Sequence, residues 1–262
     1  MANYIDDEIL CEGYTHFKVD EYPDAEALAQ LKNEITSFMQ DRAKFLLGED
    51  VKIIVEFEEG SLKTTVKVVG SAALVIALAI GDYGSFRAGV KQATDDVTML
   101  AQSANLELIF RTKTASCDRL RLESRKGVLG RVDNLLNTLE QTRILTNQAD
   151  LPAKRSEQTK FKLAVGKLVE WEKRSDRLLS KITDPSTKAC IAAGFAEELE
   201  KFDEEPHWVA TLKSDKFQRV MIATDTANLA RVSELATFYT VTVQTLKTNL
   251  QIHMKKSAPR LT

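Results

Sequence analysis

The chain is poor in the residues that build disulfide frameworks, zinc sites and tight turns. Its 262 residues include three cysteines, Cys11, Cys117 and Cys190, which lie far apart. An odd number of cysteines without C-x-x-C spacing predicts neither a disulfide framework nor a zinc site, and favours a reducing compartment. Because the chain has only 11 Gly and 5 Pro, few residues interrupt helices. We therefore expect a mainly helical protein of the cytoplasm, which can also lie at the inner face of a membrane.

Motifs that carry chemistry are also missing. The sequence has no glycine-rich phosphate loop, no H-E-x-x-H and no G-x-S-x-G. The three histidines, His16, His207 and His253, are far apart, and although His16 follows Cys11 closely, both fall in an expected loose arm. Acids gather in residues 197–207, but such runs are usually solvated surfaces rather than metal sites. We expect no enzyme, no catalytic residue, no metal ion and no cofactor.

Charge separates into two opposed blocks. Residues 1–60 hold 15 acids and 5 bases, whereas residues 111–181 hold 17 bases and 9 acids. A basic block of this size can hold the phosphates of anionic lipid or, as a weaker expectation, of nucleic acid. The alternative is that it docks on the acidic block of the same chain or a neighbouring copy. The candidate anion-binding residues are Arg119, Arg121, Arg125 and Lys126.

The most apolar segment is Val68–Gly81, which carries no charged side chain. Its fourteen residues would span about 21 Å as a helix, too short for the roughly 30 Å core of a bilayer. Ala73, Ala77 and Gly81 recur every fourth residue and would form a smooth stripe that lets two helices approach closely. We predict that this stripe is a contact between copies or with a membrane. The alternative is a helix buried on all sides in an ordinary core.

The remaining pattern predicts a helical bundle with long helices and one β-hairpin. The hairpin is expected near residues 51–69, with Gly60 in its turn, after a loose arm of 23 residues. Apolar residues recur at helical spacing in five segments: 25–47, 86–108, 114–147, 161–182 and 217–253. Because Asp150 and Pro152 interrupt this pattern, we place a domain boundary there. The prediction is an amino-terminal domain, 1–150, and a helical coiled-coil domain, 151–262.

One part of the chain resembles a known module. It consists of the run F-E-E-G-S-L-K-T-T-V-K-V-V-G, then the apolar helix, and then the run G-D-Y-G-S-F-R-A-G-V-K-Q-A-T-D-D-V. This layout resembles predicted membrane-acting effectors of bacterial conflict and phage-defence systems, called TRADD-N-like. The resemblance covers residues 51–104 and implies no catalytic residues. It favours a non-enzymatic, self-associating antiviral effector that acts on a membrane. The alternative is a cytosolic helical adaptor that binds a protein or nucleic acid partner.

Overall fold

The computed structural model describes residues 9–19, 22–58, 62–215, 219 and 225–257. Helices account for 70% of it, which confirms the prediction of a mainly helical protein. The strands are β1 (Ile9–Phe17), β2 (Lys52–Glu58), β3 (Leu62–Val69) and β4 (Arg119–Arg125). The helices are α1 (Ala25–Leu47), α2 (Ala72–Tyr83), α3 (Phe86–Thr112), α4 (Gly127–Asn147), α5 (Arg155–Lys181), α6 (Pro185–Leu199), α7 (Val209–Leu212), α9 (Thr226–Ser257) and a 3-10 turn at Ser116–Asp118.

The chain divides into two compact units. Unit 1 comprises residues 1–133 and 181–187, and unit 2 comprises residues 134–180 and 188–262. This division falls inside α4, whereas the sequence pattern placed it near residue 150, in the loop after that helix. A helix can contribute one end to each of two cores, so an interruption of the helical pattern need not mark the change from one core to the other.

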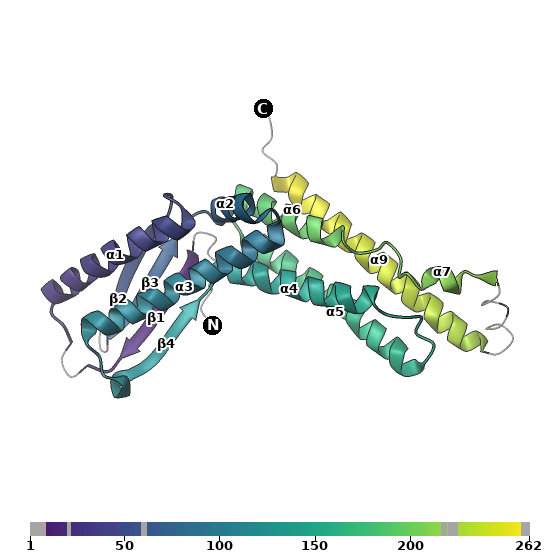
Figure 1. The fold of residues 1–262 in the computed structure, drawn as a ribbon, viewed down its shortest axis with the longest axis horizontal. Coiled ribbons are helices and arrows are strands. Elements are labelled where there is room, and N and C mark those ends of the chain that lie inside the picture. The colour runs from purple at the N-terminus through teal and green to yellow at the C-terminus, as the bar shows by residue number, and fades with distance from the viewer. Residues whose placement is uncertain (1–8, 20–21, 59–61, 216–218, 220–224, 258–262) are drawn as a thin grey trace, which may run out of the picture. The chain divides into compact units, whose positions relative to one another are not determined.

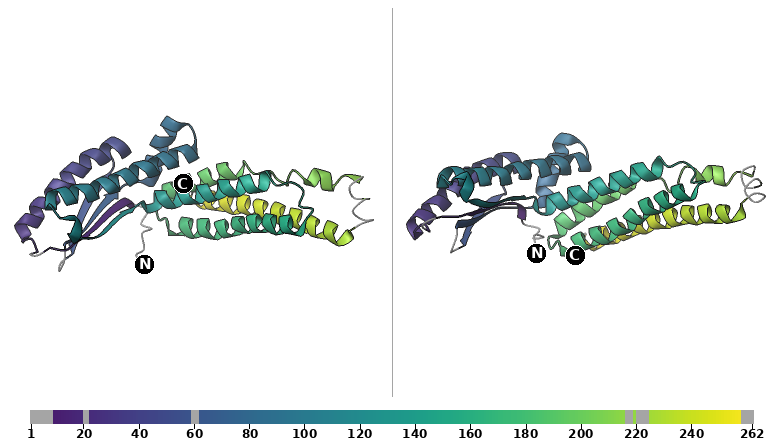
Figure 2. Two further views of the ribbon diagram at one scale, coloured as in Figure 1. Left: turned by 60° about the horizontal axis from the view of Figure 1, so that its bottom comes forward. Right: turned by 90° about the horizontal axis from the view of Figure 1, so that it is seen from below.

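Unit 1 is built on a four-stranded antiparallel sheet with the strand order β2-β3-β1-β4. Its elements follow each other as β-α-β-β-α-β, with α2 as an addition before α3. This is the ferredoxin-like, or split βαβ, connectivity. Figures 1 and 2 show α1 and α3 lying along the same face of the sheet.

The face of the sheet under these helices is apolar. Leu62, Val66 and Val55 are almost fully buried there. At Gly13 the helix comes so close that an added Cβ would lie 2.9 Å from the carbonyl oxygen of Ala101. Glycine is therefore required at this position for α3 to rest on β1.

The opposite face of the sheet carries alternating charges. Lys67 on β3 and Glu56 on β2 form an ion pair of 2.7 Å, and Lys63 and Glu58 form a second pair of 3.3 Å. The register of β2 and β3 brings the two residues of each pair close together across the two strands. This face is polar, so the sheet needs no second layer of helices to cover it.

The prediction of a single hairpin is wrong, because β2 and β3 belong to a larger sheet. The expected loose arm contains β1, and the expected helix over residues 114–147 begins with β4. In β4 the order Arg-Leu-Arg-Leu has a period of two, which is a strand pattern, but Leu120 also fits the helical spacing of the residues that follow. The predicted turn residues 59–61 lie outside the described residues.

Helix ends in unit 1 follow from capping residues. The Asp24 side chain accepts a hydrogen bond from the Ala27 N–H at the start of α1, and the Ser85 side chain accepts one from Ala88 at the start of α3. Gly84 ends α2 with φ of 73°, a left-handed conformation that glycine adopts without strain. This glycine allows the chain to turn from α2 into α3.

Unit 2 is a bundle of helices with an aromatic core. Figure 2 shows α4, α5, α6 and α9 running alongside one another. The buried Trp171 on α5 donates its indole N–H to the carbonyl of Leu135, 2.9 Å away, and its ring meets that of Phe195 edge-on at 5.2 Å. Phe161 and Trp208 form a similar pair with centroids 5.5 Å apart. Aromatic pairs of this geometry contribute beyond their burial.

The last helix of unit 2 is held to α5 by polar contacts. The Asn249 amide donates to the Glu172 carboxylate at 2.5 Å, and His253 lies 3.1 Å from Asp176. The helix expected over residues 217–253 is α9, which begins at Thr226, while residues 216–218 and 220–224 lie outside the described part.

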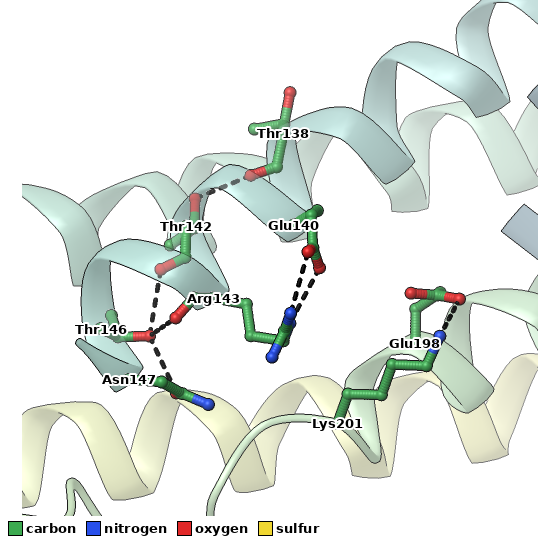
Figure 3. A network of polar contacts seen from close by, with 8 residues as sticks. All are labelled: Thr138, Glu140, Thr142, Arg143, Thr146, Asn147, Glu198 and Lys201. Carbon is green, nitrogen blue, oxygen red and sulfur yellow. Dashed lines mark hydrogen bonds and ion pairs between the residues drawn. The ribbon is translucent and has the colours of Figure 1, made fainter.

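Helix α4 carries a row of internal polar contacts, drawn in Figure 3. The Thr142 hydroxyl donates to the Thr138 carbonyl, one turn earlier, at 2.8 Å. Arg143 binds both carboxylate oxygens of Glu140, at 2.8 and 2.9 Å. These bonds satisfy polar groups that would otherwise be costly to bury in the bundle.

Candidate self-association surface

Helix α2 has a buried face and an exposed face, and both are apolar. The buried face consists of Ala72, Val75, Ile76 and Ala79. On the other side, Leu74 and Leu78 are 49% and 57% exposed. These two leucines are four residues apart and therefore adjacent on the helix surface. Because both leucines on its outer side are exposed to solvent, α2 has more apolar surface than unit 1 covers.

The predicted stripe of small residues lies mostly on this exposed side. Ala77 and Gly81 are exposed, while Ala73 is half-buried and donates its backbone N–H to the Thr187 hydroxyl at 3.3 Å. A Cβ added to Gly81 would meet no atom within 4 Å. Close packing inside unit 1 therefore does not account for small residues at Ala77 and Gly81. The alternative of a helix buried on all sides is wrong.

Helix α1 extends the exposed apolar surface of α2. A Cβ added to Gly48, just after α1, would lie 3.0 Å from Leu78 Cδ1, so the end of α1 touches the exposed face of α2. One turn before, Phe45 projects from α1 with 88% of its surface exposed. A phenylalanine so exposed beside a partly exposed leucine marks a contact surface better than either residue alone.

Helix α3 adds further exposed apolar residues to the helical layer. The Arg42 guanidinium lies 3.4 Å from the Ser103 hydroxyl, which places α1 beside α3. On α3, Leu106 and Phe110 are 66% and 75% exposed and stand one turn apart. The layer that covers the sheet thus presents apolar side chains on its outer side as well as its inner side.

The α2 segment does not have the dimensions of an ordinary membrane span. Among the helices that the structure describes, none is alone both long and apolar enough to cross a bilayer. Helices α2 and α3 pass the length and composition test only together, and the chain bends by 115° between them.

The four candidate anion-binding residues lie on β4 and in the link to α4, not on the outer face of a helix. Arg119 donates to the Thr114 carbonyl at 3.3 and 3.0 Å. Lys126 follows β4 and is exposed. The strand places Arg121 and Arg125 on the open face of the sheet, two rows apart, because each pairs with a β1 residue of that face.

Carboxylates and an aromatic ring already contact the arginines of β4. Arg125 forms ion pairs with Glu12 and Glu123, and Arg121 forms one with Glu123. Both guanidinium groups also stack near Tyr14, 5.9 and 5.1 Å from its ring centre. Burial raises the pKa of Glu123, but hydrogen bonds from Arg125 and Arg121 outweigh it and leave the pKa below its usual value. Much of the local positive charge is thus compensated within unit 1.

The two groups of residues that the sequence offered for chemistry, Cys11 with His16 and the acidic run of residues 197–207, can be located in the structure. Cys11 and His16 are five positions apart on β1, so their side chains point to opposite faces of the sheet. Burial raises the pKa of the Cys11 thiol, which makes it unreactive. In the acidic run, the buried Glu198 binds Lys201 at 2.5 Å (Figure 3). The part of the chain that the structure describes holds no group of three or more metal-ligating side chains.

Comparison with protein families, curated proteins and solved structures finds no match to this chain. Sequence reasoning found the small-residue stripe, but it did not find Phe45 or the leucines beside the stripe as exposed residues. For the two leucines the signal was present in the composition, since the run Val68–Gly81 has no charged side chain to place on either face of α2.

Proposed function

We propose that the protein is a non-enzymatic, self-associating effector, and that the exposed face of α2 is the contact between copies. The observation that carries the proposal is the outward position of Leu74 and Leu78 beside the small residues Ala77 and Gly81. Small residues allow two helix backbones to approach, and flanking leucines then fill the space on either side. Burial of such apolar surface contributes about 25 cal/mol per Å².

Lipid is the second candidate for what this face contacts. Helix α2 has twelve residues, about 18 Å of length, and no charge interrupts its outer face until Asp82. A short helix of this kind can lie along the surface of a bilayer with its apolar side in the acyl region. This mode fits the effectors of bacterial defence that residues 51–104 resemble.

The test is a charge placed on the exposed face. Leu78→Asp would bury an unpaired carboxylate in any apolar contact, at a cost of several kcal/mol, but it leaves the monomer intact because Leu78 is already more than half exposed. Leu163→Asp on α5 is the matched control, since Leu163 is 65% exposed. Light scattering measures the mass of each protein, and flotation with neutral and anionic liposomes measures lipid binding.

Self-association predicts that wild type and Leu163→Asp form the same oligomer and that Leu78→Asp is monomeric with unchanged helix content. If Leu78→Asp alone no longer floats with the liposomes, the same face of α2 also binds lipid. If all three proteins are monomers that stay with the soluble fraction, the proposed function is wrong and a helical adaptor is favoured.

A further inference from the structure

The two edges of the sheet in unit 1 have matching lengths and opposite charges. The strand order places β2 at one edge and β4 at the other, so among the strands that the structure describes each pairs with a neighbour on one side only. Both strands are seven residues long. Edge strands offer backbone N–H and C=O groups for pairing with another chain. Their lengths allow each to pair with the other along its whole length.

The charges around the edges oppose pairing between like edges. Residues 49–59, around β2, contain five acids and one base, whereas residues 113–126, around β4, contain five bases and two acids. Two β4 edges would bring basic segments together, and two β2 edges would bring acidic segments together. Pairing of β2 with β4 brings the opposite charges together, which favours association and fixes its partner.

We propose that β4 of one copy pairs with β2 of the next copy, so that the sheet continues from molecule to molecule. This inference rests on the self-association proposed above and gives it a second contact. Within the sheet β3 is antiparallel to β2 and β1, and β4 is antiparallel to β1, so β4 and β2 run in opposite directions. The new pair would therefore be antiparallel, like every existing one.

One register lets opposite charges and apolar side chains of the two edges meet. With Arg121 opposite Glu56 of the next copy, opposite charges meet on the open face, where Arg121 is 62% and Glu56 52% exposed. On the helix face the same register sets Leu122, which is 43% exposed, against Val55. A shift of two residues in one direction sets Glu123 against Glu56, and the same shift in the other direction sets Arg121 against the uncharged Ile54.

The ends of the strands limit the regular part of this pairing. Register between β1 and β4 shifts next to His16, so Arg119 would lie near Glu58 rather than strictly opposite it. At the other end Arg125 would face Lys52, the one pair of like charges. Because each copy offers two different edges, the contact is head-to-tail and propagates into a ring or filament rather than closing as a dimer.

Charge reversal and rescue test the proposal on the full chain. Arg121→Glu and Glu56→Arg should each weaken assembly about tenfold, because each sets like charges opposite one another. An equal mixture of the two variants, or both changes in one chain, should restore assembly. Lys91→Glu is the control, since Lys91 lies on α3 with 69% of its side chain exposed. Sedimentation velocity reports the assembly of each sample.

Three results would overturn edge pairing. Assembly that none of these variants changes leaves self-association standing through α2 but removes the sheet contact. If Arg121→Glu weakens assembly and Glu56→Arg does not, or the reverse, the result indicates pairing of like edges instead. A wild type that is monomeric at every concentration overturns both the proposed function and the edge contact. Supporting evidence is rescue together with assembly that weakens as salt rises, since salt screens exposed charges.

Discussion

Helix α5 packs Phe161, Leu168 and Trp171 into the core of unit 2, whereas α2 leaves Leu74 and Leu78 half exposed in unit 1. From composition alone α2 would be expected to be the more buried helix, because α5 is rich in Lys and Glu and α2 has no charge before Asp82. An amphipathic helix has one face to bury and one partner suffices. A helix that is apolar all round needs partners on all sides, and the described residues of unit 1 leave Leu74 and Leu78 of α2 about half exposed. The unsatisfied side is where a second molecule gains most.

The largest expected difference between α5 and α2 is in how much a substitution in each helix lowers the stability of the protein. Trp171→Ala should destabilise the protein by about 3–5 kcal/mol, since it removes a buried ring and the hydrogen bond to Leu135. Leu78→Ala on the exposed face of α2 should cost less than about 0.5 kcal/mol in the monomer. Urea unfolding followed by circular dichroism at low protein concentration measures both. Equal losses would mean that α2 is packed as tightly as α5.

The attachment of α2 to its neighbours should depend on pH through Asp184. Its carboxylate accepts a hydrogen bond from the Thr187 N–H at 2.8 Å, and the Thr187 hydroxyl in turn accepts one from Ala73 in α2. Hydrogen bonds from Thr187, with a smaller share from Ser186, outweigh desolvation and lower the pKa of Asp184 to about 2. Asp184→Ala should cost about 1 kcal/mol at neutral pH, the usual value of an N-cap.

The sign of this pH dependence follows from the lowered pKa. The stabilising contribution of Asp184 is complete above the ordinary value of 3.8 and disappears as the pH falls towards about 2. The stability difference between wild type and Asp184→Ala should therefore shrink over that range. Asp184→Asn keeps a side-chain acceptor and serves as the control. A difference that stays constant down to pH 2 would contradict the assignment.

Substitution of one glycine in each helix should change stability the least, but it should distinguish the two helices by its effect on self-association. Gly166 in α5 and Gly81 in α2 both have open space where a Cβ would stand. Alanine at either position should stabilise the monomer by about 0.5–1 kcal/mol through lower chain entropy. Gly81→Ala should in addition weaken self-association, whereas Gly166→Ala should not. Thermal unfolding and light scattering on both variants separate the two effects, and identical behaviour in both assays would remove Gly81 from the contact.

Sequence reasoning succeeded where one period dominated a long segment. The helical spacing over residues 25–47 matches α1 from end to end, and the spacing over residues 86–108 matches α3 up to its last turn. It failed for β1 and β4, because the local pattern of strands of nine and seven residues is short and their pairing depends on partners distant in sequence. The predicted hairpin was correct as a local unit, but only the sheet shows where its edges lie.

The surface was predictable in part for a similar reason. The spacing of Ala73, Ala77 and Gly81 puts them on one side of a helix, and this much follows from the sequence. Which side of α2 meets the core depends on α3, and no local pattern encodes that choice in a segment that is apolar throughout. The arginines of β4 show the same limit, since Glu12, one of the partners of Arg125, lies on a strand 113 residues away.

The most direct test of the central claim is light scattering on wild type and Ala77→Leu at tens of micromolar. Ala77 is exposed in the monomer, so leucine fits there without strain, but in a close helix contact between copies it would overpack by about 1–3 kcal/mol. We expect a defined oligomer for wild type and a shift towards monomer for Ala77→Leu, with the same helix content. A wild type that is monomeric with and without lipid, or an oligomer that Ala77→Leu leaves unchanged, would contradict the claim that α2 joins the copies.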